Sequence, residues 1–121
     1  MKYLVIDGLL HGTGIRDKNE GGYIKLDTLH LPDTLKIKIK SWLQKYEEEH
    51  YNSYSNAENI NELDTLGVEI AKHIKSIVNS KVTYFSSATL KEIPRIFLAK
   101  SAKNVRNFGS DLIMVSFGIG L

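Results

Sequence analysis

The chain has 121 residues, 42% of them hydrophobic and 25% charged, a size and balance that predict one globular domain over residues 1–121. It contains no cysteine, which excludes disulfides, thiolate catalysis and cysteine-based zinc sites and suits a reducing cytoplasm. The net charge of +2 does not by itself indicate a nucleic-acid partner, and no apolar run reaches the roughly 18 residues of a membrane span.

The amino-terminal part of the chain predicts two strands separated by a glycine-rich loop. Residues 3–6 (Tyr-Leu-Val-Ile) form a β-rich apolar run that ends at Asp7. This acid comes too early for a signal peptide, so we expect a cytoplasmic location. Five glycines between residues 8 and 22 predict an irregular connection. Residues 23–26 (Tyr-Ile-Lys-Leu) predict a second, short strand.

Two amphipathic helices are predicted next, at about 33–49 and about 57–79. The residues that share one face of the first helix are Leu35, Ile39, Trp42, Leu43 and Tyr46. Of these we expect Trp42 and Leu43 to be largely buried. Apolar residues from Ile60 to Val78 form the stripe of the second helix.

After the helices the pattern returns to strands. Residues 81–86 are β-branched and aromatic and predict a strand, and residues 88–93 predict a short helical turn. Two further strands are predicted at 96–99 and 112–117. This order of elements predicts an α/β (α+β) fold in which a small mixed or antiparallel sheet and the two main helices form a two-layer sandwich.

The motifs that could carry catalysis are incomplete. Residues 12–14 (Gly-Thr-Gly) follow a strand but lack the Lys-Ser/Thr pair of a phosphate loop. Glu47 and His50 have the helical spacing of metal ligands, but a metal site needs further ligands that the sequence does not supply. We therefore expect no catalytic residue, metal or cofactor. His11 and Arg16 leave a small RNA-cleaving enzyme open, with a base and a cation acting on a phosphate.

Acidic residues gather in the middle of the chain. Residues 43–69 carry one base, Lys45, and seven acids, a net charge of −6, whereas residues 70–121 carry +6. The seven acids are Glu47, Glu48, Glu49, Glu58, Glu62, Asp64 and Glu69. The first three fall at the carboxyl end of a predicted helix, where the helix dipole disfavours negative charge. Such a segment is either a solvated face or a carboxylate surface that captures a basic protein.

Six short motifs form a series along the chain. They are residues 12–17 (GTGIRD), 21–24 (GGYI), 31–35 (LPDTL), 42–47 (WLQKYE), 62–71 (ELDTLGVEIA) and 81–85 (KVTYF). In order and spacing this series resembles small bacterial immunity proteins of polymorphic toxin systems, notably those of contact-dependent growth inhibition. The resemblance covers about residues 1–92, and the residues from Pro94 onward lie outside it.

The resemblance implies a non-enzymatic protein that binds a cognate toxin domain, often a nuclease, and neutralises it in the producing cell. Because nuclease toxins commonly carry basic clefts, the seven acids between residues 47 and 69 are the expected toxin-binding residues. Thr13, Arg16 and Asp17 form the second-choice interface. We expect neither a nucleic-acid partner nor a membrane. The alternatives are a small RNA-cleaving enzyme or toxin and a generic interaction module.

Overall fold

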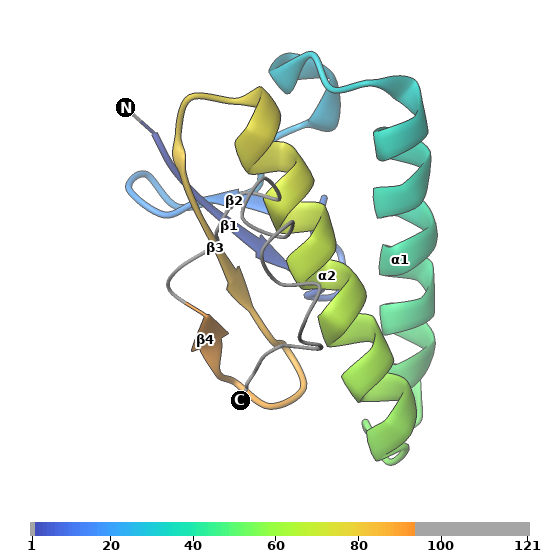
Figure 1. Cartoon of the computed structure of the whole chain (residues 1–121). Helices are drawn as coiled ribbons and strands as arrows, with labels where there is room; N and C mark the ends of the chain where they lie inside the picture. Colours follow the sequence, from blue (N-terminus) through green and yellow to red (C-terminus); the bar gives the residue numbers. More distant parts are fainter. Residues whose placement is uncertain (1, 94–121) are drawn as a thin grey trace, which may run out of the picture.

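The computed structural model describes residues 2–93 and contains a four-stranded mixed sheet covered by two long helices (Figure 1). The elements in chain order are β1 (Tyr3–Asp7), β2 (Ile15–Asp17), the 3-10 helix η1 (Leu26–Leu29), α1 (Asp33–Tyr51), α2 (Ala57–Ile77), β3 (Lys81–Phe85) and β4 (Glu92–Ile93). The expected α/β fold with two main helices on a small sheet is confirmed. The strands expected at 96–99 and 112–117 lie outside the described residues.

The sheet has the strand order β2-β1-β3-β4. β1 and β3 are parallel, because the chain crosses over through both helices between them, and Asp7 is paired with Phe85 at their carboxyl ends. β2 is antiparallel to β1, and β4 is antiparallel to β3. The segments that follow β1 and β3 therefore leave the sheet at the same edge.

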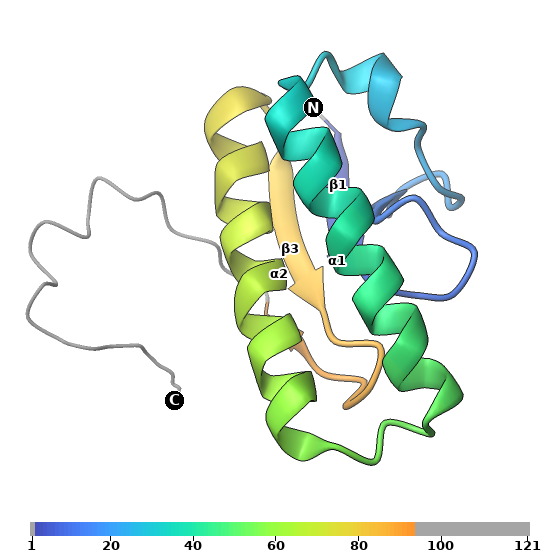
Figure 2. The same cartoon turned by 90° about the vertical axis from the view of Figure 1, so that its right-hand side faces the viewer.

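The two helices lie side by side over the same face of the sheet (Figure 2). Asn56 caps α2, since its side chain accepts a hydrogen bond from the Asn59 amide at 2.9 Å. The indole of Trp42 on α1 is fully buried, as expected, and donates to the Leu63 carbonyl of α2 at 2.8 Å. Leu43 is only half-buried, contrary to expectation, because it lies at the edge of the core beside the loop after β1.

Two local predictions were wrong. The strand expected at 23–26 is replaced by β2 at Ile15–Asp17, and Tyr23 makes only an isolated bridge with Arg16. The chain turns back earlier than expected, with the Asp7 amide donating to the Gly14 carbonyl at 3.1 Å. The helical turn expected at 88–93 is instead a tight turn into β4.

Backbone geometry explains this second difference. The Leu90 amide donates to the Ser86 carbonyl at 2.8 Å, and the Ser86 amide donates to the Lys91 carbonyl at 2.9 Å. Leu90 has a φ angle of 62°, in the left-handed region that a right-handed helical turn does not use. The chain therefore reverses direction and pairs β4 with β3.

Candidate functional site

The seven acids of the middle segment occupy different environments. Five are exposed, namely Glu47, Glu48, Glu58, Glu62 and Glu69. Glu49 is buried and Asp64 is half-buried. Within residues 2–93 none of the seven forms a salt bridge. Their negative charge is therefore not compensated by ion pairing in the described part of the chain.

A groove lies between the carboxyl-terminal turns of α1 and the amino-terminal half of α2. It has a volume of about 290 Å³. Its lining residues are Lys45, Glu48, Glu49, Asn59, Glu62, Leu63 and Leu66. The groove thus brings three of the predicted acids together with one base and two leucines.

Glu49 is the buried acid of this groove, with 8% of its surface exposed. Its Oε2 accepts a hydrogen bond from Asn59 Nδ2 at 3.1 Å, which fixes the carboxylate between the two helices. Its Oε1 is buried and has no hydrogen-bond partner among the described residues. A buried acceptor of this kind is uncommon, because buried polar atoms are normally hydrogen-bonded.

Asp64 points into the fold instead of the groove. Its Oδ1 accepts from the hydroxyls of Tyr46 at 2.7 Å and Tyr84 at 2.6 Å, and its Oδ2 accepts from Ser86 Oγ at 2.8 Å. Burial, reinforced by the neighbouring Asp64 carboxylate, raises the pKa of both tyrosines. Asp64 therefore links α1, α2 and the end of β3, which is a structural role.

The second-choice residue Arg16 belongs to another internal cluster, centred on Asp7. Asp7 is fully buried at the end of β1. Arg16 Nε donates to its Oδ2 at 3.0 Å, and the Tyr23 hydroxyl donates to its Oδ1 at 2.7 Å. Burial and this hydrogen bond raise the pKa of Tyr23. The Nε donor of Arg16 is thus engaged inside the fold.

Thr13 and Asp17 stabilise the same loop. Thr13 Oγ1 donates to the Ile24 carbonyl at 2.6 Å. Asp17 Oδ1 accepts from the backbone amides of Asn19 at 2.9 Å and Glu20 at 3.1 Å. Both side chains hold the glycine-rich segment in shape, so the loop presents a defined surface.

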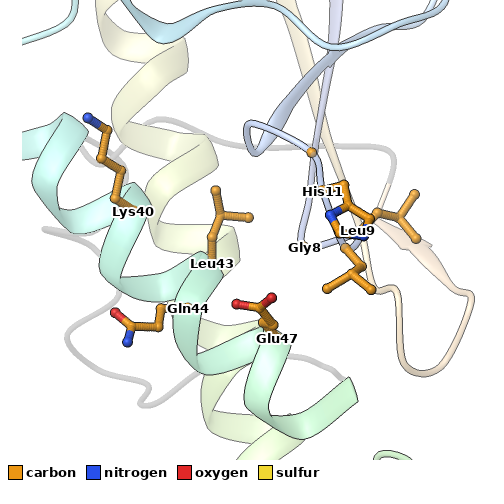
Figure 3. Close-up of a pocket in the computed structure, with 9 residues that line it drawn as sticks. Gly8, Leu9, His11, Lys40, Leu43, Gln44 and Glu47 are labelled. Atoms are coloured by element: carbon orange, nitrogen blue, oxygen red, sulfur yellow. The ribbon is translucent and has the colours of Figure 1, made fainter. Parts of the chain in front are cut away.

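A second hollow of about 280 Å³ lies between this loop and α1 (Figure 3). Its lining residues are Gly8, Leu9, Leu10, His11, Gly12, Lys40, Leu43, Gln44 and Glu47. In Figure 3 the side chains of Leu43 and Glu47 on α1 lie across the hollow from His11. Arg16 does not line it, so the pair considered for RNA cleavage is not brought together there.

Sequence reasoning did not identify several residues of these two hollows. Asn59 and Leu66 line the groove, and Lys40 and Gln44 line the hollow beside the loop. Lys40, Gln44 and Glu47 follow one another at spacings of four and three residues, which places all three near one face of α1. That spacing was the available signal for Lys40 and Gln44.

Within residues 2–93 no group of three or more His, Cys, Asp or Glu side chains is arranged to hold a metal ion. In the same part of the chain, none of the helices has the length and apolar character needed to cross a bilayer. Comparison of the chain with protein-family models, with curated proteins and with solved structures finds no match.

Proposed function

We propose that this chain is a non-catalytic immunity protein that binds a basic toxin domain in the cytoplasm. The proposed binding surface is the acidic face of α1 and α2, which is formed by Glu48, Glu49 and Glu62. The observation that carries the proposal is the groove between the helices, where Glu48, Glu49 and Glu62 form no salt bridge within residues 2–93. The resemblance to immunity proteins adds the class of partner.

The placement of the acids supports a binding role over a purely stabilising one. Glu48 and Glu49 lie at the carboxyl end of α1, where the helix dipole makes a negative charge unfavourable by a few tenths of a kcal/mol. Lysine or arginine at the exposed position of Glu48 would stabilise the helix. Exposed carboxylates also raise the association rate of a positively charged partner through long-range attraction.

The test is binding of the full chain to the toxin domain that the proposal expects from the gene directly upstream, measured by surface binding kinetics at two salt concentrations. We expect the double substitution Glu48→Gln and Glu62→Gln to slow association about threefold or more at low salt and to flatten the salt dependence. Glu20→Gln is the control, because Glu20 is also exposed but lies in the loop after β2. An unchanged association rate in the double variant would contradict the proposed surface.

A small RNA-cleaving enzyme is the second candidate, and the hollow beside the loop is what favours it. His11, Lys40 and Glu47 line this hollow and offer an acid–base group, a cation and a carboxylate. Expression of the chain alone separates the two candidates. An RNA-cleaving enzyme would arrest growth and His11→Ala would relieve the arrest, whereas harmless expression would exclude this candidate.

A further inference from the structure

The buried Glu49 carboxylate lacks one hydrogen bond. Asn59 donates to Oε2, while Oε1 has no partner among the described residues and the residue is 8% exposed. A charged oxygen removed from water without a donor destabilises the folded chain. A donor supplied by a binding partner would remove this deficit, and a positively charged donor would remove it most effectively.

The charges around Glu49 favour a cation over a neutral donor. Glu48 and Glu62 line the same groove, and Lys45 is the single base among its lining residues. Lys45 forms no salt bridge within residues 2–93, so its ammonium group is not ion-paired with these carboxylates. A cation that enters the groove therefore meets three carboxylates against one ammonium.

The size and walls of the groove suit one long side chain. The volume of about 290 Å³ lies just below the roughly 300–1,000 Å³ of pockets that hold drug-sized ligands. Leu63 and Leu66 give the groove an apolar part, against which the methylene groups of a basic side chain can pack. The charged end of such a side chain would then reach the carboxylates.

We infer that the groove binds one arginine side chain of the partner. Because Oε1 of Glu49 is buried, the carboxylate turns this oxygen toward the groove on binding, and the guanidinium then donates to it. A guanidinium carries five N–H donors in a planar fork, so it can bond Oε1 and also face Glu48 or Glu62. A lysine ammonium is a compact point charge without this fork. The inference rests on the proposed function and specifies the chemistry by which the acidic face recognises a basic protein.

The test uses N-acetyl-arginine amide as the probe and N-acetyl-citrulline amide as its neutral counterpart, each titrated into the full chain and followed by NMR. We expect saturable shifts of the Asn59 side-chain amide and the Leu63 and Leu66 methyl groups with the arginine probe alone. Glu49→Gln should weaken this binding about tenfold. Glu47→Gln should change it less than about twofold, because Glu47 lines the other hollow.

The two variants lie on the same helix and remove the same charge, whereas only Glu49 lines the groove, so their difference reports on this position. Glu49→Gln should also unfold in urea at or above the wild-type midpoint, because it removes an uncompensated buried charge. Equal weakening by both variants would reduce the effect to diffuse attraction and overturn the inference. Equal binding of citrulline, or no saturable binding of either probe, would overturn it as well.

Failure of this inference is distinguishable from failure of the proposed function. If the groove does not bind the arginine probe but the chain still captures the toxin domain with a salt-dependent rate, the binding role stands and the arginine site is wrong. If Asn59, Leu63 and Leu66 respond to the probe but no toxin domain is bound, the proposed function is wrong and the arginine site stands.

Discussion

Gly67→Ala tests how the helix layer is fitted to the sheet. A methyl group at Gly67 would lie 2.6 Å from Cζ and 2.8 Å from the hydroxyl oxygen of Tyr84. These atoms belong to the phenol that donates to Asp64 Oδ1 at 2.6 Å, one turn earlier on α2. The added methyl must therefore displace the ring and disturb the hydrogen bond that links β3 to α2.

The size of the effect follows from three contributions. Replacing glycine by alanine inside a helix stabilises it by about 1 kcal/mol. Overpacking a filled core costs about 1–3 kcal/mol, and disturbing a hydrogen bond to a charged group costs about 1.5–3 kcal/mol. Because Asp64 is half-buried, we take the lower part of the last range. We expect Gly67→Ala to lower the free energy of unfolding by about 1.5–4 kcal/mol.

Urea unfolding of four chains provides the assay: wild type, Gly67→Ala, Tyr84→Leu and the double variant. Leucine lacks the ring atoms nearest to Gly67, so Gly67→Ala in the Tyr84→Leu background should be neutral or stabilising by up to about 1 kcal/mol. The sign of the substitution thus depends on the phenol. A similar cost in both backgrounds, or a gain in the wild-type background, would refute the assigned contact.

Three further predictions concern stability. Leu43→Ala should cost about 1–2 kcal/mol in urea unfolding, less than the 2–5 kcal/mol of a fully buried leucine, because Leu43 is half-buried. Arg16→Met should lower stability by about 1–3 kcal/mol, measured by thermal unfolding, because it leaves the fully buried Asp7 without its cation; no loss would show that the pair is dispensable. The raised pKa values of Tyr46 and Tyr84 mean that the stability they contribute is complete below their unfolded pKa of about 10 and is lost as pH rises above it. The urea midpoint, measured between pH 8 and 11, should therefore decrease once the pH exceeds about 10. This decrease should be less steep in Tyr46→Phe.

Long periodic segments were predictable and short ones were not. The helices expected at 33–49 and 57–79 are observed at Asp33–Tyr51 and Ala57–Ile77, because their apolar stripes repeat over several turns. β2 has three residues and β4 has two, too few to show the alternation that identifies a strand. β2 forms because the chain folds back against β1, which is a tertiary contact without a local sequence signal.

The acidic site was predictable as a segment but not as a surface. The buried positions Leu35, Ile39, Trp42 and Tyr46 on α1 are spaced by 4, 3 and 4 residues, and a further step of three reaches Glu49. This spacing could have predicted that Glu49 is buried, although its charge argued for solvent. The hydroxyl donors that hold Asp64 come from β3, from the residue after it and from the other helix, so no local pattern could identify them.

The three consecutive glutamates show why charge alone does not define the interface. Successive helical residues are about 100° apart, so Glu47, Glu48 and Glu49 cannot share one surface. In the structure Glu47 lines the hollow beside the loop, while Glu48 and Glu49 line the groove between the helices. Replacing all three together would combine the loss of two exposed charges, Glu47 and Glu48, with the loss of the buried acceptor Glu49. Replaced singly, Glu48 should act on the association rate and Glu49 on the dissociation rate, because exposed charges steer a partner and buried ones hold it.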